Sequence, residues 1–175
     1  MTTTISPTGI ERRFGDSEIL VSRTDKDGYI TYCNGLFRDI TGYGNKALVG
    51  QPHNCMRHPD MPRSIFMRLW DGLDEAKEDV FAYVQNLATN GDHYWTFARI
   101  SPARDDKGDV VGYEASRRVP NRTVVREIIE PLYKELCDIE AKFDDADEGL
   151  KASNDHLSAL LRDKSTSYRH FVLSL

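Results

Sequence analysis

The sequence lacks the features of several common functional classes. Among its 175 residues, 23 are Lys or Arg and 28 are Asp or Glu, a net charge of −5. A nucleic-acid-binding domain usually carries a clustered basic surface, so nucleic acid is not an expected partner. No apolar run reaches the roughly 20 residues that cross a bilayer, and the polar N-terminus lacks the apolar segment of a secretory signal. We therefore expect a cytoplasmic protein with no membrane span of its own, although a partner could recruit it to the membrane.

Cysteine is scarce, and the usual catalytic motifs are missing. Cys33, Cys55 and Cys137 form neither a CxxC pair nor a zinc-type spacing. Sparse, unpaired cysteines are typical of reduced thiols in a cytosolic protein. There is no G-x-S-x-G elbow, H-E-x-x-H motif or P-loop. A cysteine with histidines nearby in the sequence does not define a thiol enzyme. We predict that the protein is not an enzyme and holds no metal site.

What is present divides the chain into two regions of different character. Glycine, aromatic residues and short alternating runs dominate up to about residue 120, whereas residues 121–175 contain one glycine and one proline and read as helix. The predicted organisation is an N-terminal cap or arm at 1–16, a sensor domain at 17–120 and a helical signalling or dimerisation segment at 121–175.

The first region predicts an α+β domain. Alternating apolar residues and tight-turn signals indicate five strands, at 18–23, 29–32, 80–88, 93–101 and 110–119. Short helices are expected after Asn34, which can act as an N-cap, at 46–49 and at 63–73. One five-stranded antiparallel sheet with helices on one face satisfies this order.

The C-terminal region carries a heptad-like apolar stripe. Apolar residues recur at spacings of four and three, with one polar step at Ser153: Val125, Ile129, Leu132, Leu136, Ile139, Phe143, Ala146, Leu150, Leu157 and Leu160. This pattern predicts a long helix of coiled-coil character over 125–160, roughly 50 Å in length. It would pair in a homodimer or with a partner protein, and the alternative is a helix folded back on its own domain. Pro131 predicts a kink or a restart.

The most unusual segment is the irregular loop from Gln51 to Asp60. It places Arg57, His58 and Asp60 within four positions. A guanidinium pairs well with phosphate, and an imidazole can donate, accept or titrate near neutral pH. The alternative is a surface loop held by an Arg–Asp pair. Trp70 adds an aromatic face on the following helix, unless it packs in the core.

Three motifs give the chain a family resemblance. Gln51-Pro-His-Asn54, Arg57-His-Pro-Asp-Met-Pro62 and Asn90-Gly-Asp-His-Tyr-Trp95 are long and specific. With the segments Thr24–Asn34 and Thr41–Tyr43, they closely resemble the PAS domain of bacterial aerotaxis receptors, over roughly residues 15–135. The resemblance implies a PAS fold and non-covalently bound FAD that senses redox state or oxygen.

The resemblance also implies a set of flavin-site residues by position: Asn34, Arg57, His58, Asp60, Trp70 and Asn86. Asn34 and Asn86 would hydrogen-bond the edge of the isoalloxazine ring. Arg57 and His58 would hold the phosphates or adjust the flavin potential, and Asp60 would orient that pair. Trp70 would stack on the ring or wall the cavity.

Aerotaxis receptors continue into a membrane anchor and a methyl-accepting-type coiled coil, which this sequence does not contain. We therefore expect a stand-alone energy sensor whose C-terminal helix signals to a separate chemotaxis-type transducer; an excised fragment is the alternative. Flavin reduction would rotate an amide such as that of Asn86, and the change would pass through the sheet to the helix after Val119.

Three alternative functions stay open at this stage. A haem-binding gas sensor would use His53, His58 or His93 as axial ligand. A light-driven flavin adduct at Cys55 would follow from the Asn54-Cys55 pair, although the rest of the light-sensing signature is missing. A ligand-free interaction module would act through its helical segment alone. A PAS unit could also feed a kinase or a nucleotide cyclase instead of motility.

Overall fold

The computed structural model describes residues 5–75 and 79–175. The described residues form two compact units, and each is described by itself. The first comprises the chain up to His58 together with Val84–Val119, and the second comprises Pro59–Tyr83 and Pro120–Leu175. The segment 59–83, which the sequence pattern includes in the sensor domain, thus groups with the C-terminal region by its contacts.

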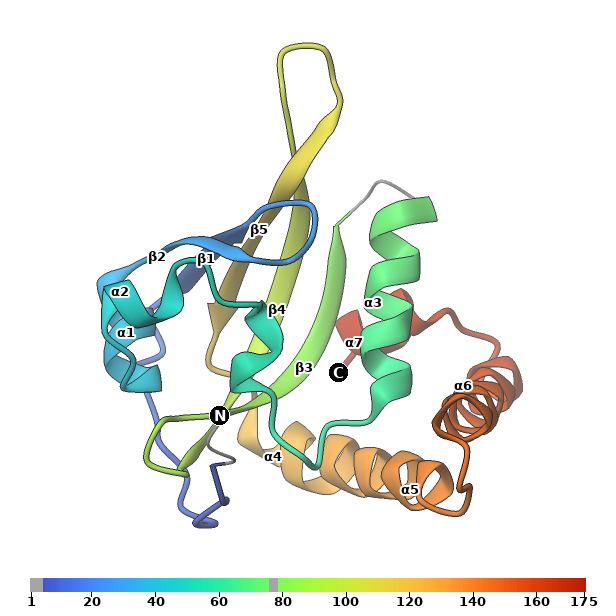
Figure 1. Cartoon of the computed structure of the whole chain (residues 1–175). Helices are drawn as coiled ribbons and strands as arrows, with labels where there is room; N and C mark the ends of the chain where they lie inside the picture. The colour runs from blue at the N-terminus through green and yellow to red at the C-terminus, as the bar shows by residue number, and fades with distance from the viewer. Residues whose placement is uncertain (1–4, 76–78) are drawn as a thin grey trace. The chain divides into compact units, whose positions relative to one another are not determined.

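The five predicted strands form one antiparallel sheet. The strands are β1 (Leu20–Thr24), β2 (Ile30–Cys33), β3 (Val80–Leu87), β4 (His93–Arg104) and β5 (Val110–Arg118). Their order is β2-β1-β5-β4-β3 (Figure 1). Strand β5 is central, and Arg117 on it lies opposite Leu20 of β1 and Ala98 of β4. Residues directly opposite in an antiparallel pair share a face, so Arg117 lies on the face of these buried apolar residues.

Short helices follow the first hairpin, as the turn residues predict. They are α1 (Gly35–Thr41), α2 (Asn45–Leu48) and the 3₁₀ turn η1 (His53–Met56). Asn34 caps α1 by accepting from the N–H of Phe37, and Gly42 ends the helix at a φ of 72°. Phe37, Leu48 and Met56 pack with Leu20 and Tyr94 in one buried apolar cluster.

The N-terminal arm runs beside β4. The N–H of Thr8 donates to Gly91 O, and Arg12 N–H donates to His93 O. The Arg12 guanidinium also reaches Ile40 O at the end of α1. These contacts tie part of the predicted cap or arm at 1–16 to the first unit; residues 1–4 of that segment lie outside the described residues.

The helices of the second unit are shorter than the sequence pattern predicts. They are α3 (Arg63–Glu75), α4 (Arg122–Val124), the π-helical turn η2 (Val125–Ile129), α5 (Glu130–Glu140), α6 (Ala146–Asp163) and α7 (Tyr168–Leu173). Pro131 lies in the first turn of α5, directly after η2, and the backbone stays helical across this junction. The predicted kink or restart thus corresponds to a change from π-helical to α-helical bonding without a break in the helix.

A C-terminal helix is present in α6, but the predicted single helix over 125–160 is not formed. The chain leaves helical structure after Glu140, and Asp145 starts α6 by accepting from the N–H groups of Asp147 and Glu148. A β-carbon on Gly149 would lie 2.6 Å from Glu140 O, so glycine permits the close approach of α5 and α6. The two helices form a hairpin because Asp145 caps the start of α6 and because Gly149, which has no side chain, lets α6 pass close to the end of α5.

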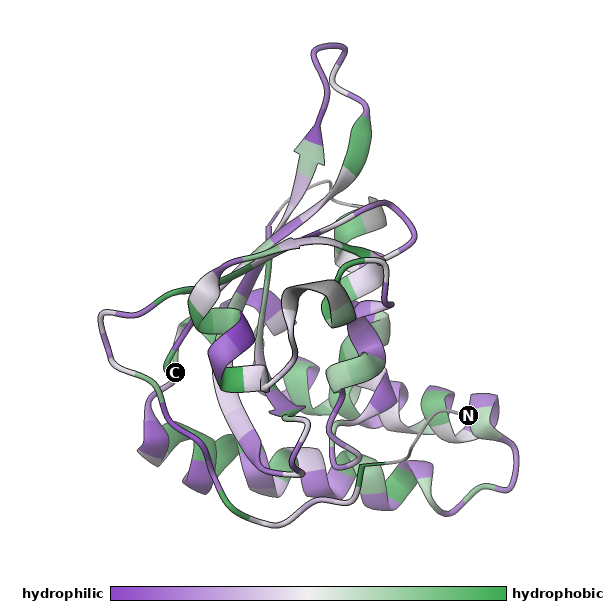
Figure 2. Ribbon diagram, turned by 60° about the vertical axis from the view of Figure 1, so that its left-hand side comes forward, coloured by the Kyte–Doolittle hydropathy of each residue, from purple (hydrophilic) through white to green (hydrophobic). Residues whose placement is uncertain are grey.

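The hairpin packs on α3, so the alternative of a tail folded back is the one observed within this unit. The Glu140 carboxylate accepts from the N–H groups of Arg63 and Ser64, each at 3.0 Å, and thereby caps α3. The hydroxyls of Ser64 and Ser153 are 2.7 Å apart and buried. Figure 2 shows the mixed hydrophilic and hydrophobic colouring of these helices. Across the described ranges, no helix has both the length and the hydropathy of a membrane span.

Candidate functional site

Asn86 supplies an unsatisfied polar group inside the first unit. Its side chain projects from β3, and the residue is 5% exposed. The Nδ2 atom is buried, and within the described residues it has no hydrogen-bond partner. Leaving a buried donor unpaired costs about 1–3 kcal/mol. An uncompensated buried amide of this kind makes Asn86 a candidate binding residue.

The backbone of the segment that contains Arg57 and His58 lies against β3 at Asn86. Arg57 forms an isolated antiparallel bridge with Asn86, which brings the loop after η1 against β3. His58 is 3% exposed, and its ring packs edge-on against the ring of His93 with centroids 5.7 Å apart. The structure therefore brings together three of the predicted site residues.

A second polar cluster, formed by Ser22, His53 and Arg117, lies in the same unit. Arg117 Nη1 donates to Ser22 Oγ at 2.9 Å, and Nη2 is 2.8 Å from His53 Nε2. Burial and the adjacent guanidinium lower the pKa of His53 to about 3, so its ring is neutral at pH 7. Burial lowers the pKa of Arg117 to about 10, which leaves it charged at neutral pH.

Asn34 has a structural task. Its Oδ1 accepts from the N–H groups of Phe37 and Val21, each at 3.1 Å, and its Nδ2 donates to Ile19 O at 2.8 Å. These bonds use three of the four that an amide can make. Its predicted contact with a ligand stays a prediction.

Asp60 and Trp70 belong to the second unit. The carbonyl oxygen of Asp60 accepts from the Cys137 thiol at 3.4 Å, and its side chain is exposed. Trp70 lies on α3 and is 42% exposed. The structure therefore places these two residues in a different unit from Asn86 and Arg57.

The structure also describes the surroundings of Cys55, the residue of the light-driven adduct, and of His53, one of the candidate haem ligands. Burial raises the pKa of the half-buried Cys55 thiol, so the thiol stays protonated at neutral pH. His53 Nε2, the atom that a haem iron would need, already faces the Arg117 guanidinium. The alternatives at His58, His93 and Cys55 stay predictions.

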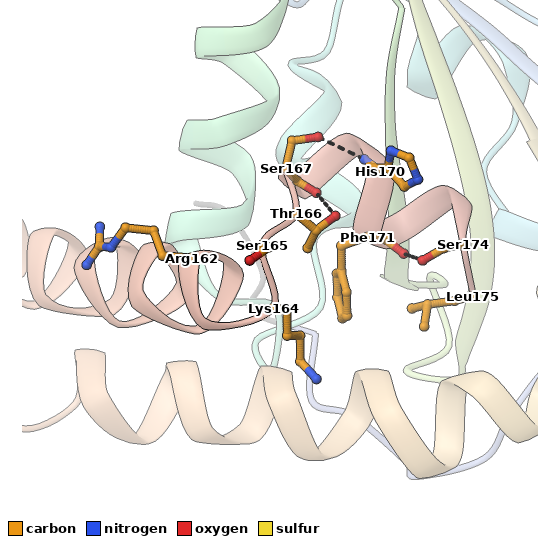
Figure 3. Close-up of a pocket in the computed structure, with 9 residues that line it drawn as sticks. All are labelled: Arg162, Lys164, Ser165, Thr166, Ser167, His170, Phe171, Ser174 and Leu175. Carbon is orange, nitrogen blue, oxygen red and sulfur yellow. Dashed lines mark hydrogen bonds between the residues drawn. The ribbon is translucent and has the colours of Figure 1, made fainter.

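An open pocket of about 900 Å³ lies at the C-terminal end of the second unit (Figure 3). Its lining includes the cationic side chains of Arg162 and Lys164 together with His170, and several hydroxyl groups surround them. Ser167 caps α7 by accepting from the N–H of His170. None of the predicted site residues lines this pocket.

Sequence reasoning did not select the cluster around Arg117. The alternation in β5 nevertheless places Arg117 in phase with the buried Ala115. A charged residue at a position where the alternation of a central strand predicts a buried apolar side chain could have indicated this cluster. Ser22 and His53 carry no comparable signal, because their approach to Arg117 depends on tertiary structure.

The arrangement of the sheet and the short helices defines the class of protein. A family model described as PAS fold matches residues 30–117, about half of the chain. The protein therefore belongs to the PAS family.

Comparison with individual proteins refines this assignment. The aerotaxis receptor of Escherichia coli (strain K12) is 42% identical over 123 residues, which is 69% of this chain and 23% of the receptor. The chain thus spans about a quarter of that relative. Among solved structures, the light state of the blue-light photoreceptor Aureochrome1 LOV is 18% identical with a TM-score of 0.57, covering 64% of this chain and 89% of that chain. A structure described as "Flavin Analogue Sheds Light on Light-Oxygen-Voltage Domain Mechanism" is 22% identical with a TM-score of 0.56, over 67% and 87%.

Proposed function

We propose that this PAS protein is a cytoplasmic, non-enzymatic redox sensor of the aerotaxis type that binds FAD non-covalently. The observation that carries the ligand assignment is the buried, unpaired Nδ2 of Asn86. An amide donor suits the oxygen and nitrogen acceptors at the edge of a flavin ring. The similarity to an aerotaxis receptor supports flavin over other ligands with the same acceptors.

When bound, FAD would supply a ring system that can be reduced and reoxidised without turnover of a substrate. Asn86 would donate to the ring edge. Arg57, which β-bridges to Asn86, and the buried His58 would hold the phosphates or adjust the potential. Asn34, Asp60 and Trp70 enter this assignment through the family resemblance alone.

The C-terminal helices would carry the output. Strand β3 bears Asn86 near one end, and nearer its start the carbonyl of Tyr83 accepts from the Tyr133 hydroxyl on α5 at 2.7 Å. A shift of β3 would therefore act directly on α5. The change in α5 would alter a homodimer or a heteromeric complex, and a separate chemotaxis-type transducer would respond to it.

The first experiment is an absorption spectrum of the freshly purified protein, followed by extraction of the chromophore. Paired blue and near-ultraviolet bands with release of intact FAD are the expected result. A strong violet band would instead identify haem, and light-induced bleaching that Cys55→Ala abolishes would identify a photoreceptor. Protein that stays colourless after incubation with FAD would contradict the proposal.

The relay is tested separately by hydrogen exchange of residues 130–163 in the oxidised and dithionite-reduced protein. We expect exchange to change on reduction in the wild type and to change much less in an Asn86→Ala variant that still binds FAD. Equal changes in both proteins would remove Asn86 from the relay while leaving the ligand assignment intact.

A further inference from the structure

The cluster of Ser22, His53 and Arg117 contains a buried cation without a counter-ion. Arg117 is 4% exposed, and its hydrogen-bond acceptors are the Ser22 hydroxyl, the His53 ring and, at 3.4 Å, the carbonyl of Ala115. All three acceptors are neutral. In the ranges that the structure describes, no carboxylate pairs with this guanidinium, whereas Arg23 on the neighbouring strand pairs with Glu114 at 2.7 Å.

The donors of Arg117 are also only partly used. A guanidinium has five N–H groups in a fixed fork, and the three acceptors account for at most three of them. For the other two, no acceptor is present in the described parts of the chain. The guanidinium thus has both the charge and the free donors that bind an anionic oxygen.

Packing alone does not explain this residue. The guanidinium carbon lies 5.2 Å from the centroid of the Phe37 ring, and such a contact offsets only part of the cost of burying a charge. That cost is large when the charge has no ionic partner, and well-packed apolar residues are often at least as stable in its place. The neutral partners position the guanidinium but do not offset its charge.

We propose that Arg117, positioned by Ser22 and His53, is an anion-binding subsite for a negatively charged oxygen of the ligand of this PAS unit. The inference rests on the proposed function for its ligand. In FAD such an oxygen is available from the phosphates, or from the ring once it has gained two electrons and one proton and so carries one negative charge. In both cases the guanidinium of Arg117 would bind an anionic oxygen.

The test begins with the flavin-free protein and inorganic phosphate. We expect phosphate to raise the thermal midpoint of the wild type above that in sodium chloride of equal ionic strength. Arg117→Met should remove this difference and should fold at least as stably as the wild type at low ionic strength. Arg117→Lys, which keeps the charge, should retain part of the difference, and the control Arg23→Met should retain all of it.

Flavin binding then identifies the source of the oxygen. If the phosphates bind here, Arg117→Met weakens FAD and FMN by about 10- to 100-fold and leaves riboflavin unchanged. If the reduced ring binds here, the three oxidised flavins keep their affinities, while the midpoint potential in a dithionite titration shifts to more negative values.

Two results would overturn the inference. One is an Arg117→Met protein that is less stable than the wild type and shows the same phosphate response, flavin affinities and potential; Arg117 would then be a packing residue. The other is a wild type without any phosphate response that binds flavin independently of Arg117. If the wild type binds no flavin, the proposed function fails, and the phosphate response alone decides whether the subsite exists.

Discussion

Replacing Asn86 by leucine should stabilise the ligand-free protein and weaken its binding of FAD. The side chains are similar in size, but leucine has no polar atom. In the wild type, Nδ2 is buried and unpaired among the described residues, which costs about 1–3 kcal/mol. Removing that donor should therefore raise the free energy of unfolding of the ligand-free protein by roughly the same 1–3 kcal/mol.

The same substitution removes a donor that the ligand would use. A hydrogen bond of this kind contributes about 0.5–1.5 kcal/mol net, so the affinity for FAD should fall by up to about tenfold. Stability is measured by urea unfolding of flavin-free protein, and affinity by quenching of flavin fluorescence. Gln85→Leu makes a matched change at the neighbouring position, whose side chain points to the other face of β3.

Opposite directions for stability and affinity are the decisive result. An Asn86→Leu protein that loses unfolding free energy and keeps its FAD affinity would show that the amide has a partner within the chain. It would also show that the amide is not the ligand's donor, and the argument for a binding element at β3 would fail.

Three further predictions concern the helical hairpin and His53. Gly149→Ala should destabilise the protein in urea unfolding by about 1–3 kcal/mol, because its methyl group meets the Glu140 carbonyl; a gain of about 1 kcal/mol would instead indicate a continuous helix. Tyr133→Phe removes the bond to Tyr83 O, and hydrogen exchange of α5 should then respond less to flavin reduction. His53 has a folded-state pKa of about 3, against about 6.5 when unfolded. The unfolded state therefore binds more protons between these values, and stability falls as pH drops below 6.5 by up to about 1.4 kcal/mol per unit. Urea unfolding from pH 7 to 4 should show this slope in the wild type and a reduced slope in His53→Gln.

The strands were predictable because local signals suffice for them. Turn residues separate the five alternating runs, and a sheet follows from their order. The helical hairpin was not predicted, since spacings of four and three arise equally in a coiled coil and in helices that fold back on one domain. The residues after Phe143 did carry a signal: Asp145-Ala-Asp-Glu148 is a capping pattern as well as an acidic face.

The site was predictable only in part, because some of its contacts join residues that are far apart in the sequence. The irregular loop and the strand position of Asn86 could be read from the sequence, and the structure adds that its amide is buried and unpaired. The triad of Ser22, His53 and Arg117 joins residues up to 95 positions apart. No local spacing encodes such a contact, so only the charge of Arg117 at an apolar-face position of β5 could have pointed to it.

An amide without a hydrogen-bond partner and a buried charge without a counter-ion, both among the described residues of one small unit, argue for a single missing ligand. A PAS unit that worked only as an interaction module would gain stability by replacing both the orphaned amide and the unpaired guanidinium with apolar side chains. The two groups are also chemically complementary to one kind of ligand: a neutral donor matches a heterocycle edge, and a cationic fork matches an anionic oxygen. A flavin nucleotide carries both. A ligand that satisfied only one of them would leave the other as an unexplained loss of stability, which is why the substitutions at Asn86 and Arg117 are most informative when measured on the same flavin.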